Sequence, residues 1–252
     1  ADIVDVLERT ARKNDVKIVY RAAERILTKD GAVRAVEAGG REYVCDCVLL
    51  ATGGVSYRAT GSDGWGHKAA ERLGHTIVSL RGSLVPLEAE QAFCAKMQGL
   101  SLKNTALTMF DEKGKKAYSD FGEMMFTHFG VTGPMVLSAS AHMKPDKKYY
   151  IVIDMKTALT ETKLDERILR DFGSSLNRDI SNCLPALMPK SMIPAALEYC
   201  GLAGCTKVNS VTKDQRRRLV EFLKRLRIDI KGQRPINEAI VTSGGVKVGE
   251  VN

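Results

Sequence analysis

The feature that most constrains the fold is the apolar run from Val48 to Ala51, which is followed directly by Thr52-Gly53-Gly54. Four consecutive residues without a polar side chain are typical of a strand that is buried on both faces of a parallel sheet. Such a strand needs sheet neighbours and covering helices. Before it, the sequence predicts only a helix over residues 2–14 and a small antiparallel meander over residues 17–44. Residues 1–81 therefore predict part of an α/β domain.

The remaining sequence changes its periodicity twice. Residues 82–154 predict mainly strands, at 100–111, 115–121 and 148–154, interrupted by a short helix from Pro134 to His142. Residues 155–226 predict helices, which three prolines divide into short pieces. We expect residues 227–231 to return to the β-rich segment and residues 232–252, with a strand at 238–242, to rejoin the first domain. The expected fold class is α/β (mixed α+β).

Charge and cysteine usage bear on partners and on location. The chain has 38 Lys+Arg and 30 Asp+Glu, a net charge of +8. Its basic cluster, residues 216–227, is interleaved with Leu219, Phe222, Leu223 and Leu226 at helical spacing, so we expect a solvated helix face and no nucleic-acid partner. The apolar runs are far shorter than the roughly 20 residues that cross a bilayer. Six irregularly spaced cysteines predict reduced thiols in a cytoplasmic protein without a metal site.

Two strand ends carry residues that suit a ligand. Ala51-Thr52-Gly53-Gly54 and Thr242-Ser243-Gly244-Gly245 have small side chains or none, so a phosphate, a ribose or a flat ring can approach the main chain. A tight turn packed against a helix is the alternative interpretation of the first segment. Gly64-x-Gly66-x-x-Ala69 matches the dinucleotide fingerprint by spacing, but twelve residues separate it from Ala51, so we interpret the match as accidental.

The segment from Thr127 to Pro134 is a third candidate. His128 suits a general acid, a general base or a hydrogen-bond donor to substrate near neutral pH, although a lone histidine is more often structural. Paired carboxylates, a Gly-x-Ser-x-Gly elbow and a Walker lysine are absent from the sequence, which disfavours hydrolases and phosphotransferases.

Taken in order, the motifs ATGG, FTHxGxxGP and TxGGV resemble the flavoprotein family that includes the aminoacetone oxidase-like NAD(P)/FAD-dependent oxidoreductases. The resemblance implies a partial FAD-binding two-nucleotide-fold domain, like that of glutathione reductase, with an inserted β-rich, barrel-like domain and a small helical domain. It implies FAD contacts at Ala51, Thr52, Gly53, Gly54, Ser56, Thr60, Gly61, Ser62, Thr242, Gly244, Gly245 and Val246. Thr127 and His128 are the implied groups on the substrate side.

The sequence also departs from that family. The family's opening strand and Gly-rich turn for the FAD pyrophosphate are absent, and so is its closing Gly-Leu-x-x-Ala-Gly-Glu segment. We therefore expect an internal fragment that is inactive in isolation and binds FAD weakly or not at all. The parent is expected to transfer electrons between flavin and a nicotinamide, NAD(P)H, or a small organic substrate. The alternative is a binding module whose basic helix contacts nucleic acid or a protein partner.

Overall fold

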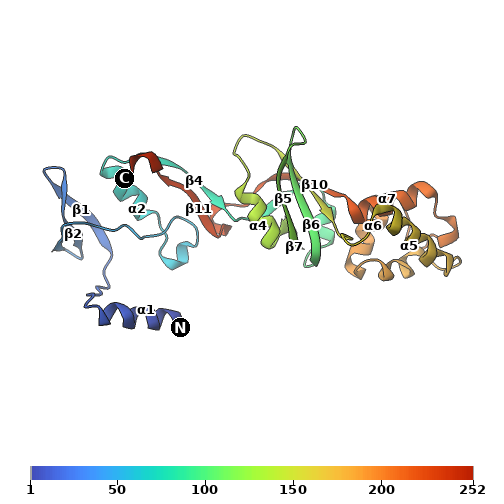
Figure 1. The fold of residues 1–252 in the computed structure, drawn as a ribbon, viewed down its shortest axis with the longest axis horizontal. Helices are drawn as coiled ribbons and strands as arrows, with labels where there is room; N and C mark the ends of the chain where they lie inside the picture. Colours follow the sequence, from blue (N-terminus) through green and yellow to red (C-terminus); the bar gives the residue numbers. More distant parts are fainter. Residues whose placement is uncertain (1, 252) are drawn as a thin grey trace. The chain divides into compact units, whose positions relative to one another are not determined.

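The computed structural model describes residues 2–251, and Figure 1 labels its helices and strands. The chain forms two compact units. The first contains the residues up to Gly53, Gly64–Ile77 and the residues from Val246 onward. The second contains Gly54–Asp63 and Val78–Gly245.

The first unit begins with helix α1 and a three-stranded meander. The bounds are α1 Asp2–Lys13, β1 Ala23–Lys29, β2 Ala32–Ala38 and β3 Arg41–Val44, with the strands antiparallel in the order β1-β2-β3. Asp30-Gly31 and Gly39-Gly40 make the two turns with positive φ at every central residue, which matches the right-handed twist of the strands. The predicted meander is therefore confirmed from β1 to β3. Residues 17–20 form no strand.

The predicted buried strand at Val48–Ala51 is wrong for this chain. These residues have no regular secondary structure, and Leu49 is 90% exposed. An apolar run becomes a buried strand only where other strands satisfy its backbone and other side chains cover it. The described residues of the first unit supply no such strands beside it. Helix α2, Trp65–Arg72, follows after Gly64 rather than after a strand, which agrees with the interpretation of the fingerprint match as accidental.

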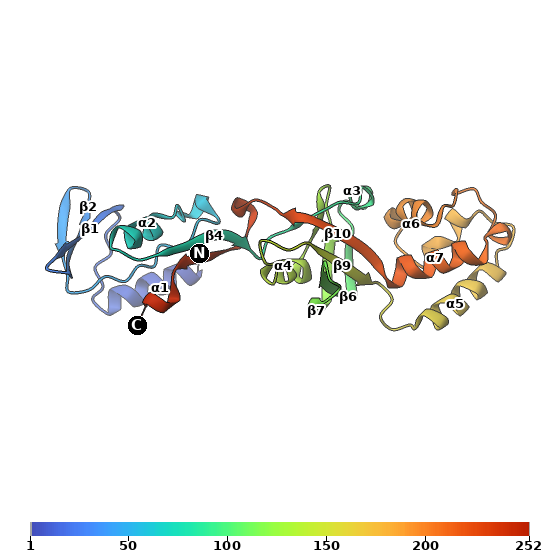
Figure 2. The same cartoon turned by 90° about the horizontal axis from the view of Figure 1, so that it is seen from above.

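The second unit contains a closed six-stranded barrel with the strand order β10-β5-β8-β7-β6-β9 (Figures 1 and 2). Its strands are β5 Leu87–Ala89, β6 Ser101–Asp111, β7 Lys116–Phe126, β8 Gly130–Thr132, β9 Tyr149–Asp154 and β10 Leu226–Gln233. Strand β10 pairs with both β5 and β9 and so closes the barrel. Helices α3, Phe93–Lys96, and α4, Pro134–Ala141, belong to the same unit. The expected β-rich, barrel-like segment is confirmed.

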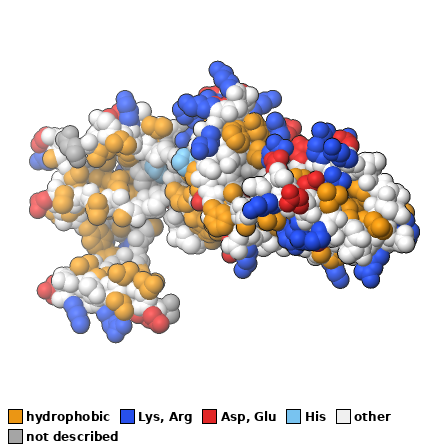
Figure 3. All heavy atoms as spheres, turned by 45° about the vertical axis from the view of Figure 1, so that its right-hand side comes forward, with side chains coloured by type: hydrophobic (Ala, Val, Ile, Leu, Met, Phe, Trp, Pro, Cys, Tyr) orange, Lys and Arg blue, Asp and Glu red, His pale blue; other side chains and the backbone are white. Residues whose placement is uncertain are grey.

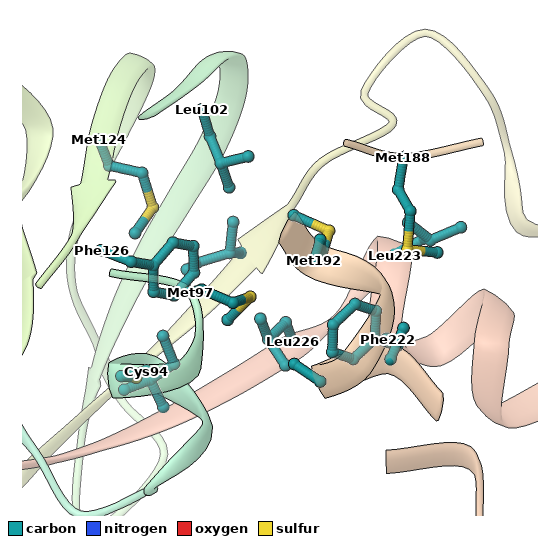
Figure 4. Close-up of a cluster of buried hydrophobic side chains, with 14 of the residues drawn as sticks. Cys94, Met97, Leu102, Met124, Phe126, Met188, Met192, Phe222, Leu223 and Leu226 are labelled. Atoms are coloured by element: carbon teal, nitrogen blue, oxygen red, sulfur yellow. The ribbon is translucent and has the colours of Figure 1, made fainter. Parts of the chain in front are cut away.

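The helical part of the second unit packs against the barrel through one continuous apolar core. Its helices are α5 Glu161–Gly173, α6 Ile193–Cys200 and α7 Lys213–Lys224, with 3-10 turns at Ile180–Asn182, Leu184–Ala186, Lys190–Met192 and Val208–Ser210. Figure 4 shows the junction, where Met97, Leu102 and Phe126 belong to the same cluster as Met192, Phe222 and Leu226. Pro185 and Pro194 stand within the first turns of their helices, where a missing N–H costs nothing.

Strands β4, Ile77–Ser83, and β11, Val241–Val246, form a separate two-stranded sheet. Short turns at Arg58–Thr60, Ile236–Glu238 and Val248–Glu250 complete the elements. The sheets formed by residues 2–251 are thus the meander, the barrel and this pair, and the two-nucleotide fold remains an expectation. No helix in this range is both long and apolar enough to span a bilayer.

The cysteine thiols are free. Burial raises the pKa of Cys94 and Cys200 to about 12, so both thiols stay protonated near neutral pH. We interpret them as core residues without a chemical role.

Candidate functional site

The two strand ends that the sequence singles out meet at Gly54 and Thr242. The Oγ1 atom of Thr242 accepts hydrogen bonds from the backbone N–H groups of Val55, at 2.9 Å, and Ser56, at 3.1 Å. A Cβ atom on Gly54 would lie only 2.5 Å from the Cβ of Thr242. Glycine is therefore required at position 54 because the threonine side chain fills the space of any larger residue.

Gly244 and Gly245 have different reasons to be glycine. Both have positive φ, 95° and 113°, a region that other residues rarely adopt. At Gly244 a Cβ would also lie 3.0 Å from the carbonyl oxygen of Val78 on β4. The bare backbone of β11 is thus needed for its close approach to β4. Val246, the last predicted residue of this segment, belongs to the first unit.

The other predicted cofactor residues are mostly exposed. Ala51, Thr52 and Gly53 lie on the surface of the first unit, and Gly53 has a φ of 72°. In the second unit, Thr60 and Gly61 are exposed and Ser62 is half-buried. The hydroxyl of Thr60 donates to the carbonyl oxygen of Tyr57 at 2.8 Å.

For FAD, the cofactor that the resemblance implies, the residues fit in part. The main chain of Ala51, Thr52 and Gly53 is open to a phosphate or ribose. In the same unit the Nδ1 atom of His67 is buried and has no hydrogen-bond partner among residues 2–251; a bound polar group would satisfy it. Thr242 and Ser56 do not fit as ligand-binding side chains, because each already engages the other, with 3.2 Å between their hydroxyl oxygens.

The turn from Thr127 to Gly130 holds the second candidate group. The N–H of Thr127 donates to the carbonyl oxygen of Gly130 at 2.8 Å, and the N–H of Gly130 donates to Oγ1 of Thr127 at 3.1 Å. The hydroxyl of Thr127 therefore stabilises the turn. His128 is exposed and meets the ring of Phe129 edge-on, with 5.0 Å between the ring centroids. The hydroxyl of Thr127 is thus engaged in the turn, whereas the imidazole of His128 is accessible.

Arg234 organises the surroundings of this turn. It forms ion pairs with Glu88 at 2.8 Å and Glu238 at 2.7 Å, and its guanidinium lies 4.5 Å from the ring centroid of Phe129. The hydrogen bond from Arg234 lowers the pKa of Glu238, and the positive charge that His128 can carry acts in the same direction. We did not predict Arg234 from the sequence, because the only local signal is its four-residue spacing from Glu238.

The basic face of α7 is neutralised by carboxylates. Arg216 binds Asp165 at 2.6 Å, and Arg217 binds Asp214 at 2.7 Å. The remaining cations of residues 216–227 also have acidic partners: Arg218 with Asp214, Lys224 with Asp154, Arg225 with Glu161 and Arg227 with Asp229. Paired cations attract a polyanion weakly. This arrangement disfavours the alternative in which α7 contacts nucleic acid.

Comparison with known proteins gives one family. A family model described as "HI0933-like protein barrel and H2TH domain" matches residues 81–241, more than half of the chain. The ribosomal RNA dihydrouridine synthase of Haemophilus influenzae is 27% identical over 250 residues, covering 97% of this chain and 59% of the relative. The corresponding synthase of Escherichia coli K12 is 24% identical over 250 residues, covering 99% of this chain and 60% of the relative.

A relative with a different name matches equally well. The 3-dehydro-bile acid delta(4,6)-reductase of Clostridium scindens is 26% identical over 260 residues, covering all of this chain and 62% of the relative. The chain thus spans about three fifths of the length of these relatives. The flavoprotein resemblance is confirmed at the level of the superfamily, while nothing points to aminoacetone oxidases in particular. The chain belongs to the HI0933-like family of FAD-dependent oxidoreductases.

Proposed function

We propose that the protein carrying this chain is a flavin-dependent reductase of a carbon–carbon double bond conjugated to a carbonyl group. The proposal rests on one observation: the names of the relatives describe reactions on the same kind of double bond. Dihydrouridine differs from uridine by two hydrogens across the ring double bond, which is conjugated to a ring carbonyl. A 3-dehydro-bile acid with delta(4,6) double bonds is likewise a conjugated ketone. Although the two molecules differ, the same reaction, reduction of a conjugated carbon–carbon double bond, applies to both.

The reaction adds a hydride to the carbon far from the carbonyl and a proton to the carbon next to it. Bound FAD in its reduced form would supply the hydride, and a reduced nicotinamide, NADH or NADPH, would supply the electron pair that balances the reaction. The protein must bind the flavin, polarise the carbonyl and deliver the proton. We propose that the open main chain at Ala51–Gly53 contacts the cofactor.

We propose His128 as the residue that meets the substrate. Its imidazole is accessible, and it stands on a turn held by Thr127 and Gly130. A protonated imidazole can donate a hydrogen bond to the carbonyl or a proton to the adjacent carbon.

The test separates the two halves of the reaction in the FAD-loaded protein. Reduction of the flavin by NADPH or NADH and its reoxidation by a conjugated ketone are followed by flavin absorbance without oxygen. His128→Ala should leave the reduction rate within about twofold and slow reoxidation by about 10²-fold or more, the usual contribution of a general acid. His128→Gln, which keeps a hydrogen-bond donor, should recover part of the rate if the carbonyl is the target.

His142→Ala is the matched control, because His142 stacks on Tyr118, with 4.7 Å between the ring centroids, away from the Thr127–Gly130 turn. It should leave both rates unchanged. Reoxidation that is equally fast with and without His128 would remove this residue from the proposal. Failure of every conjugated ketone to reoxidise the flavin would contradict the reaction itself.

A further inference from the structure

A second group of cations, on the barrel side of the second unit, differs from α7 in being largely unpaired. Arg81, Lys144, Lys147, Lys148 and Lys231 line one hollow of about 230 Å³. They come from β4, from the loop between α4 and β9, and from β10. Figure 3 shows the Lys and Arg side chains that gather at one end of the barrel. We call these five residues the barrel cluster.

The charges of the barrel cluster are mostly available. Lys147 forms an ion pair with Asp111 at 3.2 Å. Arg81 donates only to uncharged oxygens, the carbonyl of Met143 and the hydroxyl of Ser243, each at 3.4 Å. The other three lysines have no ion pair with any residue between 2 and 251, and their side chains are exposed. The cluster thus keeps a surplus of positive charge that α7 lacks.

The loop that carries three of these lysines is fixed at both ends. The N–H of Lys144 donates to the hydroxyl of Tyr149 at 3.0 Å, and the N–H of Lys148 donates to a carboxylate oxygen of Glu112 at 3.1 Å. Tyr149 in turn pairs with Ile230 across β9 and β10. The loop is therefore anchored to the barrel at Tyr149, while the flexible lysine stems let the ammonium groups follow a ligand.

We propose that the barrel cluster binds the phosphates of an RNA backbone and so positions an RNA substrate. This inference rests on the proposed function and selects RNA from the two substrate classes of the relatives. Several cations around one shallow hollow match the repeated single charges of a phosphodiester chain. A bile acid has a single carboxylate and a large apolar body, which requires an apolar slot rather than five cations.

The contact would position RNA without reading its sequence. Lysine ammonium groups bind phosphate oxygens as point charges, and the cluster offers no aromatic side chain on which a base could stack. Sequence or base recognition would then fall to the site where the chemistry occurs. Binding through the cluster should accordingly be strongly salt-dependent and tolerant of sequence.

The test compares two triple variants of the FAD-loaded protein that remove the same charge. Lys144→Ala/Lys148→Ala/Lys231→Ala removes the unpaired lysines of the cluster. Lys163→Ala/Lys190→Ala/Lys213→Ala removes three exposed lysines of the helical part, which likewise have no ion pair in the described chain. The affinity for a fluorescein-labelled single-stranded RNA is measured by anisotropy at several KCl concentrations.

The cluster variant should bind about 10-fold to 100-fold more weakly, and the slope of log K against log salt should fall by about 2, since each phosphate contact contributes about 0.7. The control variant should bind like the unaltered protein. Equal losses in both variants, or no loss in either, would overturn the inference. Binding of the cluster to vesicles containing phosphatidylserine, with no loss of RNA affinity, would assign the site to a lipid surface and also overturn it.

Turnover separates this inference from the proposed function. The cluster variant should raise KM for a uridine-containing RNA and leave reduction of a small conjugated ketone unchanged. If no substrate is reduced but RNA affinity still depends on the cluster, the proposed reaction fails and the binding site stands. If a substrate is reduced but the cluster variant binds RNA as tightly as the unaltered protein, the proposed reaction stands and the binding site fails.

Discussion

At the scale of single residues, close packing explains several of the glycines. Gly54 faces Thr242, Gly66 faces Thr52, and Gly130 faces the backbone of β5. For Gly54, the sequence left open whether the reason for a small residue is a ligand or a neighbouring chain segment. Arg234 escaped prediction altogether, because its partner Glu88 is 146 positions away in the chain.

Gly130→Ala tests this packing directly. A Cβ at this position would lie 2.6 Å from the backbone nitrogen of Ala89, and backbone cannot move aside without breaking the pairing of β5 with β8. We expect the variant to lose about 1–3 kcal/mol of unfolding free energy, measured by thermal or urea unfolding. Gly173→Ala is the control, because an added Cβ there would project into open space. A loss of stability in the control as large as in Gly130→Ala would contradict the packing argument.

The ion pairs of Arg234 predict a pH dependence. Arg234 lowers the pKa of Glu238 in the folded protein. This carboxylate therefore stabilises the folded state at pH values above the ordinary pKa of a glutamate, about 4.3. The contribution is lost as the pH falls through the lowered folded value. The difference in Tm between the unaltered protein and Arg234→Gln should therefore shrink between pH 6 and acid conditions. A difference that grows on acidification would contradict the assignment.

At the scale of elements, turn residues and apolar spacing predicted the helices and hairpins that form from neighbouring residues of the chain. The Asp-Gly and Gly-Gly turns fixed the meander, and the apolar spacing of residues 219–226 marked the buried side of α7, whose Leu219, Phe222 and Leu223 are at most 1% exposed. The run at Val48–Ala51 failed as a strand because its prediction assumed sheet neighbours. Closure of the barrel by β10 depends on pairing between residues more than 130 positions apart, which periodicity alone does not reveal.

The end of α7 is tied to the barrel by Lys224. Its side chain is 10% exposed, and its Nζ donates to Asp154 at 2.5 Å and to the carbonyl oxygens of Lys156 and Leu159, at 3.0 and 2.7 Å. Lys224→Met would leave the Asp154 carboxylate without its cation and remove a donor from two half-buried carbonyl groups, so we expect a loss of about 1–3 kcal/mol in urea unfolding.

Lys213→Met, at the exposed start of the same helix, serves as the matched control and should change stability by less than about 0.5 kcal/mol. Equal effects of the two substitutions would contradict a specific role for Lys224.

At the scale of the whole molecule, the barrel and helical part share one core, while the first unit leaves apolar side chains exposed. Leu49 is 90% exposed and Leu7 on α1 is 64% exposed. The flavin absorbance of a purified sample of these residues tests the expectation of weak FAD binding, and a near-equimolar value would contradict it.

The measurement that tests the central claim most directly is the mass of the reaction product. The FAD-loaded protein is supplied with a reduced nicotinamide and, in separate reactions, with a uridine-containing RNA and a steroid enone. The account predicts that at least one acceptor gains two hydrogens, in proportion to the nicotinamide oxidised. Oxidation of the nicotinamide at the expense of oxygen alone, with both acceptors unchanged in mass, would contradict it.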